Sequence, residues 1–246
     1  MKKVLLCAAI IAAFASCKKD SSKPDSPSSS AEVEANWSST AQYGSWSNGG
    51  YTLNNDVWGN GHGPQTIWAN SYSNWGVWSN QPNTGGVKSY PNASIDVNRS
   101  LSSLHTVKSS FNCSTPSGGS WESTYDIWDQ SHANETMLWF NWTGNVGPIS
   151  YNYGSNGAIP VYTNVNVGGY TWNVYRGNNG GNNVYSFLCT SKRNSGTVDI
   201  LAIQRWIQSK GWFGNITQGD VQYGFEITSS SGGLNFSTNS YSVTYN

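Results

Sequence analysis

Hydrophobic and polar residues alternate in short segments along most of the chain, with Gly, Asn and Ser between the segments. Three clear examples are residues 170–175, 184–189 and 241–245. Because successive side chains of a strand point to opposite faces, this alternation predicts half-buried β-strands. Their near-regular spacing is typical of an all-β jelly-roll sandwich, in which two curved antiparallel sheets pack together.

One segment, residues 197–210, follows a helical period instead. Its apolar positions lie on one side of a helix, and they are Ile200, Ile203, Trp206 and Ile207. Asp199 falls in the first turn, where a negative charge is favourable, and Lys210-Gly211 supplies a stop. The pattern predicts a single amphipathic helix packed outside the sheets, with its Trp in the core rather than in a ligand site.

The alternation also sets acidic side chains among apolar ones. In residues 134–141 the positions of Thr136, Leu138 and Phe140 share one face, which predicts core. Glu135, Met137 and Trp139 share the other face, which predicts the floor of a groove. An ionised Glu buried without a partner is costly, so Glu135 is expected in a polar cleft; an ordinary exposed strand face is the alternative.

Two further acids show the same pattern. In residues 221–227 every odd position is apolar, and Gln222, Gly224 and Glu226 share the polar face. Asp126 lies between Tyr125 and Ile127, which point to the core by the same rule. Three acids on groove faces of different strands meet only if those strands are neighbours, which spacing along the chain does not establish.

Composition indicates a ligand that is neutral and rich in hydroxyl groups. The 246 residues include Trp 13 and Tyr 14, only 11% are charged, and 13 basic residues balance 13 acidic ones. Such a chain lacks the basic surface that nucleic acid requires. Exposed aromatic rings and abundant amides suit sugar rings and their hydroxyl groups, although the same aromatics also fill β cores. We expect a monomer with no nucleic-acid partner.

The N-terminal residues predict export. Residues 1–17 join Lys2-Lys3 to a short apolar run and end at Phe14-Ala15-Ser16-Cys17, which resembles a lipoprotein box with Cys17 as the lipidated residue. Ordinary signal-peptidase cleavage is the alternative. Residues 18–36, rich in Ser, Pro, Lys and Asp, predict a flexible linker, and 37–246 one domain. We expect a bacterial lipoprotein at the outer membrane, cell surface or periplasm, attached to membrane only through this anchor, or otherwise a secreted protein.

The remaining cysteines and the histidines show no metal-site spacing. Cys113 and Cys189 stay in the mature domain, either as one disulfide or as two buried thiols. His62, His105 and His132 lie far apart in the sequence, so no metal and no cofactor are expected.

Several motifs, in order, resemble glycoside hydrolase family 12, the compact jelly-roll endoglucanases. The segment ETMLW at 135–139 is similar to the ELMIW of that family, and 147–149 to its GPI. Residues 165–169, with Trp172, resemble its VNVGG segment, and 184–187 its VYSF. Upstream, 54–59 is similar to NNxWG, 87–92 to VKSYxN, and 125–127 to its YDL/YDI strand. The similarity spans nearly all of 51–246.

The resemblance implies a role for each matching residue. Glu135 is implied to be the nucleophile, Glu226 the acid/base, and Asp126 a neighbour that helps set the protonation of Glu135. The implied substrate contacts are Met137, Trp139, Trp58 and Asn55, with Asn54 an alternative to Asn55. Where many members have HxDW this chain has Tyr72-Ser73-Asn74-Trp75, and Trp75 and Trp78 are candidates to face substrate. Around the acid/base the usual Pro is missing.

The implied activity is internal cleavage of β-1,4-glucan with retention of configuration, by two carboxyl groups acting as nucleophile and as acid and then base. Mixed-linkage glucan and xyloglucan are alternative substrates, since they differ from cellulose-type glucan only in what the groove admits. A non-catalytic glycan-binding lipoprotein on the same fold is the rival from another class. A structural surface lipoprotein is a third interpretation.

Overall fold

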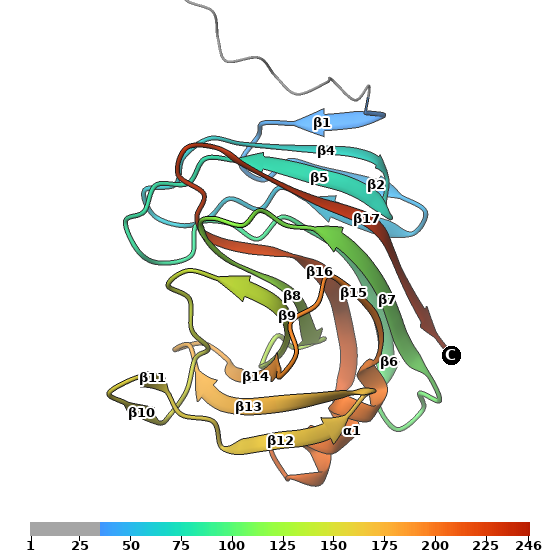
Figure 1. The fold of residues 1–246 in the computed structure, drawn as a ribbon. Coiled ribbons are helices and arrows are strands. Elements are labelled where there is room, and N and C mark those ends of the chain that lie inside the picture. The colour runs from blue at the N-terminus through green and yellow to red at the C-terminus, as the bar shows by residue number, and fades with distance from the viewer. Residues whose placement is uncertain (1–34) are drawn as a thin grey trace, which may run out of the picture. The chain divides into compact units, whose positions relative to one another are not determined.

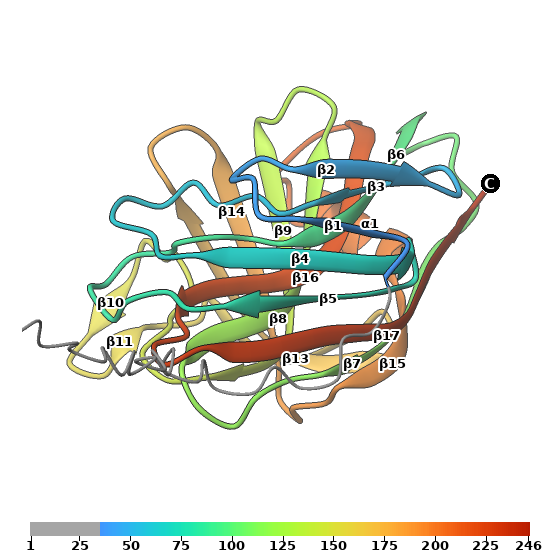
Figure 2. The same cartoon turned by 90° about the horizontal axis from the view of Figure 1, so that it is seen from above.

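The computed structural model describes residues 35–246, which form one compact unit. Two large curved sheets pack face to face, as Figures 1 and 2 show, and one helix lies outside them. This is the all-β sandwich that the alternation predicts. The predicted signal, the predicted lipidation at Cys17 and all but the last two residues of the predicted linker lie outside the described residues.

The smaller of the two large sheets has six strands, in the order β1-β4-β5-β17-β7-β15. Its strands are β1 (Trp37–Ser39), β4 (Gln65–Ser71), β5 (Asn74–Ser79), β7 (Val107–Ser114), β15 (Ser195–Asp199) and β17 (Leu234–Tyr245). All its pairings are antiparallel. The last strand of the chain, β17, therefore lies inside the sheet, between β5 and β7.

The larger sheet has nine strands, in the order β12-β13-β14-β9-β8-β16-β6-β3-β2. Its strands are β2 (Ser45–Asn48), β3 (Tyr51–Asn54), β6 (Asn92–Ser100), β8 (Ser120–Asp129), β9 (Asn134–Thr143), β12 (Tyr162–Val167), β13 (Tyr170–Asn178), β14 (Asn183–Cys189) and β16 (Thr217–Ser229). Only β14 and β9 pair in parallel. A separate hairpin joins β10 (Tyr153–Gly154) to β11 (Gly157–Ala158).

Aromatic side chains fill the space between the two large sheets. Phe111 of β7 lies 4.5 Å from Phe140 of β9, measured between ring centroids, and Trp75 of β5 lies 5.7 Å from Phe225 of β16. Burying a side chain of this size stabilises the fold by about 1.5–3 kcal/mol. These contacts fix which face of each strand belongs to the core.

The helix α1 (Ile200–Ser209) is shorter at its start than the pattern predicts. Residues 197–199 belong to β15, and Asp199 is the N-cap, whose side chain accepts a hydrogen bond from the backbone N–H of Ala202 at 3.0 Å. A capping Asp satisfies one of the free N–H groups of the first turn, which explains why the helix begins there. The predicted apolar side packs on the core, and Trp206 is half-buried against it.

Cys113 and Cys189 are both buried free thiols, which decides between the two alternatives. The Cys113 thiol lies 3.7 Å from the Ser123 hydroxyl, and the Cys189 thiol donates to the carbonyl of Ser191 at 3.2 Å. Within residues 35–246 no helix has the length and apolar character needed to cross a membrane.

Candidate active site

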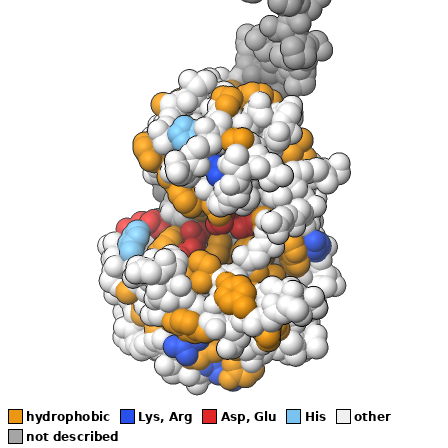
Figure 3. All heavy atoms as spheres, turned by 90° about the vertical axis from the view of Figure 1, so that its left-hand side faces the viewer, with side chains coloured by type: hydrophobic (Ala, Val, Ile, Leu, Met, Phe, Trp, Pro, Cys, Tyr) orange, Lys and Arg blue, Asp and Glu red, His pale blue; other side chains and the backbone are white. Residues whose placement is uncertain are grey.

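Three neighbouring strands of the large sheet carry the predicted catalytic acids on one face. Glu135 lies on β9, Asp126 on β8 and Glu226 on β16, and β8 runs between the other two. Their chain neighbours Tyr125 and Phe225 point into the core. The acids therefore share the opposite face, and Figure 3 shows acidic side chains gathered in a cleft across the molecule.

Glu135 is nearly covered, with 8% of its surface exposed. Its Oε2 accepts a hydrogen bond from Asn182 Nδ2 at 2.8 Å and a longer one from Asn179 Nδ2 at 3.4 Å. Both amides come from the turn between β13 and β14, and β14 pairs in parallel with β9, with Val184 opposite Glu135. The sequence analysis missed the two Asn residues because the parallel pairing that brings the turn to Glu135 leaves no local signal.

Glu135 and Asp126 interact through their carboxyl groups: Asp126 Oδ1 is buried without a hydrogen-bond donor, and a bond to Glu135 raises the pKa of Asp126 and lowers that of Glu135. Burial raises the pKa of Glu135, while the hydrogen bonds from Asp126 and Asn182 oppose that rise. Burial, followed by the charges of Glu135 and Glu226, raises the pKa of Asp126 well above its ordinary value. Since a carboxylate can only accept hydrogen bonds, Asp126 is the partner that holds the proton and donates it. Glu135 is thus the better stabilised anion of this pair.

Burial raises the pKa of Glu226 as well, but one hydrogen bond opposes that rise here, against two at Glu135. Burial raises the pKa of Glu226 to about 7, the hydrogen bond from Glu122 opposes this, and the charge of Glu135 adds to it. Two residues before Glu226, Gly224 lets β16 lie close to the segment before β6, because a Cβ there would lie 2.1 Å from the Pro91 carbonyl oxygen. A carboxyl group that stays protonated near neutral pH is suited to give up a proton and take one back.

Glu122 is a fourth acid at this site, which the sequence analysis did not single out. It lies on β8, is 2% exposed, and stands directly opposite Glu226 across the β8–β16 pair. A signal for it was present, because Glu122 and Asp126 are four residues apart on one strand. An even spacing puts both on the same face.

Met137 and Trp139 lie on the cleft face of β9, as predicted, but under a layer of other side chains. They are 5% and 2% exposed and pack in a small apolar cluster with Val184 and Leu188. The covering side chains are Trp142, Val146, Ile149 and Tyr175. A pocket of about 360 Å³ opens beside this layer, between residues 145–148, the β10–β11 hairpin and Tyr175. Direct sugar contact by Met137 or Trp139 stays a prediction.

Of the two contacts predicted near residues 54–59, one has an accessible side chain. Trp58 is 50% exposed, as a residue that stacks on a sugar must be. Asn55 is fully buried; its amide donates to the Ala41 carbonyl, and its side-chain oxygen accepts from Gln65. The prediction that Asn55 contacts substrate is therefore wrong. The alternative, Asn54, is half-buried on the cleft face and donates to Asn92 at 3.2 Å.

The predictions for Trp75 and Trp78 are also wrong. Trp75 is completely buried in the main core, among the side chains that join the two large sheets. Trp78 is 37% exposed, but it faces away from Trp75 and Val77 on the same strand. It therefore lies on the outer face of the six-stranded sheet, and the cleft is formed on the other sheet.

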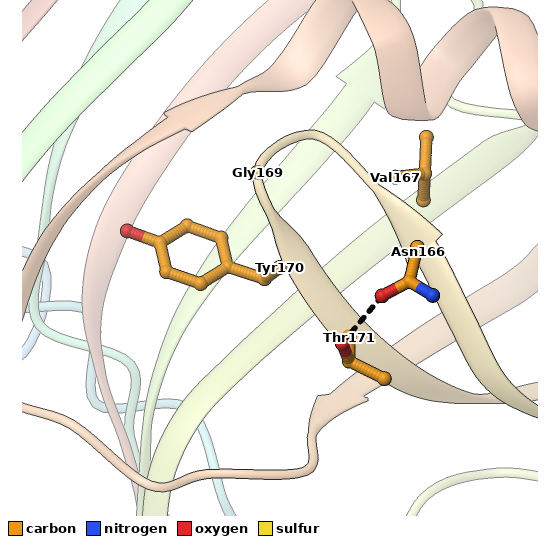
Figure 4. A pocket seen from close by; sticks show the side chains of 5 residues that line it. All are labelled: Asn166, Val167, Gly169, Tyr170 and Thr171. Atoms are coloured by element: carbon orange, nitrogen blue, oxygen red, sulfur yellow. Dashed lines mark hydrogen bonds between the residues drawn. The ribbon is translucent and has the colours of Figure 1, made fainter.

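A further depression lies outside the acid cluster. The depression in Figure 4, about 290 Å³ in volume, lies at the β12–β13 turn and is lined by Asn166, Val167, Gly169, Tyr170 and Thr171. It holds no carboxyl group and no part of the acid cluster. Among residues 35–246 no group of three or more His, Cys, Asp or Glu side chains is arranged to hold a metal ion.

Comparison with known proteins shows which family the chain resembles. The model of glycosyl hydrolase family 12 matches residues 49–246. A probable xyloglucan-specific endo-beta-1,4-glucanase A from Aspergillus terreus is 33% identical over 227 residues, covering 82% of this chain and 85% of that protein.

Solved structures agree with that match. The xyloglucanase domain of NopAA, a type three effector from Sinorhizobium fredii, in complex with cellobiose, is 56% identical with a TM-score of 0.84, covering 86% of this chain and all of that one. A family 12 xyloglucanase from Bacillus licheniformis is 26% identical with a TM-score of 0.74, covering 85% of this chain and all of its own. The chain belongs to glycosyl hydrolase family 12.

Proposed function

We propose that the chain hydrolyses β-1,4-glucan by double displacement, with Glu135 as nucleophile and Glu226 as acid/base. One observation carries the assignment: both acids face the same cleft from strands on either side of β8, and their surroundings differ. Hydrogen bonds from Asp126 and Asn182 stabilise the ionised form of Glu135. Burial keeps the pKa of Glu226 at about 7. Two carboxyl groups with different protonation are what retention requires.

In the first step Glu226 gives its proton to the glycosidic oxygen as Glu135 attacks the anomeric carbon. A glycosyl ester forms on Glu135 and the leaving sugar departs. This step removes the charge of Glu135, which had raised the pKa of Glu226. Glu226 is then the more readily ionised group, and in the second step it accepts a proton from the attacking water while the ester bond breaks.

Endo-acting cleavage follows from the shape of the cleft. Figure 3 shows an open furrow across one face rather than a closed pocket, so a polymer lies through it with its ends free. Trp58, half exposed, supplies a surface for stacking on a sugar ring. As a family 12 member the chain is a glycoside hydrolase, and an internal β-1,4-glucosidic bond is the bond we assign to it.

Xyloglucan is the favoured polymer among the candidate glucans. Several relatives that match most of the chain are named as xyloglucan-specific enzymes or xyloglucanases, whereas others with similar coverage are named as cellulases or endoglucanases. The preference for xyloglucan is supported by the relative that is 56% identical, which is named as a xyloglucanase domain. Xyloglucan carries side branches, which an open cleft accommodates.

The test is reducing-end release from carboxymethylcellulose, mixed-linkage glucan and xyloglucan by the wild type and by Glu135→Gln and Glu226→Gln. We expect the highest rate on xyloglucan and a loss of about 10³-fold or more in both variants, because each step of the reaction needs both groups. Asp96→Asn, which removes an exposed carboxyl on β6, is the control. Full activity in either Gln variant would disprove the assignment of that residue, whereas binding without release by the wild type would indicate a glycan-binding protein.

We also propose that Cys17 is lipidated and anchors the enzyme to a bacterial membrane. The Ala15-Ser16-Cys17 sequence after an apolar run supports this. Cys17→Ser is expected to appear in the soluble fraction or as unprocessed precursor, while the wild type sediments with membranes. Identical fractionation of the two proteins would contradict the anchor and leave the catalytic proposal untouched.

A further inference from the structure

Glu122 is a buried acid with no part in the double displacement. It stands opposite Glu226 in the β8–β16 register and is more deeply buried than Glu226. Its Oε2 is covered and accepts no hydrogen bond from any group in residues 35–246. An ionised oxygen in that position lacks both water and a donor, which is costly. A protonated carboxyl at Glu122 resolves this, because it becomes the donor.

The partner for that donor is the carboxyl group of Glu226, directly across the β8–β16 pair, and only one of two acids placed in this way can be ionised without strong repulsion. Burial, followed by the charge of Glu226 and the hydrogen bond to it, raises the pKa of Glu122 well above its ordinary value. Glu122 therefore keeps the shared proton, and Glu226 is the group that loses and regains one.

The other titratable groups around Glu226 do not offer a competing donor. Asp126 on β8 and Glu135 on β9 act on one another, and Asp126 donates to Glu135. Tyr90, from the segment before β6, donates its hydroxyl to the Thr124 carbonyl at 3.2 Å. Lys88, on the same segment, turns its ammonium group to the Gly85 carbonyl. No cation is among the groups that shift the pKa of Glu226.

We propose that Glu122 is the positioning residue of the acid/base: a protonated carboxyl that donates a hydrogen bond to Glu226 and stabilises the carboxylate formed when Glu226 gives up its proton. This rests on the proposed function. Glu122 keeps its own proton throughout. When the glycosidic bond breaks, the proton of Glu226 goes to the leaving oxygen and the carboxylate accepts the bond from Glu122. When water attacks, its proton goes to Glu226.

The arrangement makes the site two hydrogen-bonded acid pairs side by side. Asp126 supports Glu135 in the first pair and Glu122 supports Glu226 in the second. In each pair the supporting acid, whose pKa is raised well above its ordinary value by burial, holds the proton, and the acid that we assign to the chemistry carries the changing charge.

The experiment compares Glu122→Gln and Glu122→Leu in the full-length protein, with near-ultraviolet circular dichroism to confirm that each is folded. Gln keeps an N–H donor but cannot titrate, while Leu removes the donor at similar volume. The pH profile of kcat/KM reports the protonation of Glu226 in the free enzyme. We expect Glu122→Leu to shift the alkaline limb of the kcat/KM profile to higher pH by about one unit, because the hydrogen bond that stabilises the Glu226 carboxylate is lost.

We expect kcat of Glu122→Leu to fall about tenfold or more with KM little changed, since the lost interaction acts on the carboxylate formed during reaction. Glu122→Gln should keep the wild-type limb and most of kcat. Asp96→Asn, at a residue that shifts none of the four acids, is the control. A folded Leu variant with the wild-type profile, or equal losses in Leu and Gln with no shift of the limb, would overturn the proposal. If Glu135→Gln and Glu226→Gln were themselves active, the catalytic assignment would fail first.

Discussion

The raised pKa of Glu226 predicts that this residue lowers stability as the pH rises. A carboxyl group whose pKa is higher in the folded than in the unfolded state favours folding most when it is protonated. That stability is fully present below the unfolded pKa of 4.5 and is lost as the pH rises to about 7. Glu226→Gln removes the titration, because the amide stays neutral. The variant should therefore gain stability over the wild type at neutral pH and above.

The size of this gain follows from the shift. A rise from 4.5 to about 7 corresponds to about 3 kcal/mol at high pH. Glu226 is half-buried rather than fully covered, so solvent screening reduces the figure to about 1–2 kcal/mol. For a domain of this size such a difference moves the melting temperature by about 2–8 °C.

The assay is urea unfolding followed by Trp fluorescence at about pH 5 and about pH 8, for the wild type and for Glu226→Gln. We expect the variant to gain about 1–2 kcal/mol more at the higher pH than at the lower. Asp96→Asn, at an exposed carboxyl on β6, separates the effect of a buried charge from that of a surface one. An equal effect of Glu226→Gln at both pH values would refute the reasoning, because it would show that Glu226 titrates alike in the folded and unfolded chain.

Three further predictions follow from the site and the core. Asp126→Asn should shift the acidic limb of the kcat/KM profile and lower kcat about tenfold or more, because a hydrogen bond to the nucleophile changes; an unchanged profile would contradict this. Trp58→Ala should raise KM for xyloglucan about tenfold, since stacking is lost, while Trp78→Ala on the outer sheet leaves it unchanged; equal effects would contradict the placement. Cys113 and Cys189 should react with a thiol reagent only in urea, and rapid labelling of the native domain would show that they are not buried.

The two-residue period of a strand predicted the face of a side chain best where core and cleft positions alternate along one strand. Asp126 and Glu226 each lie between aromatic or aliphatic neighbours that are buried between the sheets, and the face of Glu135 followed from the buried Leu138 and Phe140 at odd spacing on the same strand. The same rule was available for Trp75 and Trp78. Their spacing of three is odd, so the two rings cannot share a strand face. The resemblance had suggested substrate contact for both, but a Trp fills a core equally well.

Other features of the site depend on contacts between distant segments. Asn182 reaches Glu135 because β14 pairs in parallel with β9, and no local pattern encodes that pairing. Asn55 lies in a motif similar to one that contacts sugar, but Gln65 and the Ala41 carbonyl take up its hydrogen bonds. Motif position therefore placed the segment correctly and left the direction of the side chain undetermined.

The place of β17 in the six-stranded sheet bears on how the protein forms. No strand other than β17 links β1, β4 and β5 to β7 and β15 within this sheet. Within this sheet the two halves therefore join only through β17, and the pairing of Trp78 with Asn235 brings together residues that are far apart in the sequence. Long-range pairings of this kind slow folding. Before β17 pairs with them, the edges of β5 and β7 are open, and unpaired strand edges of this kind are sites where a partly folded chain aggregates.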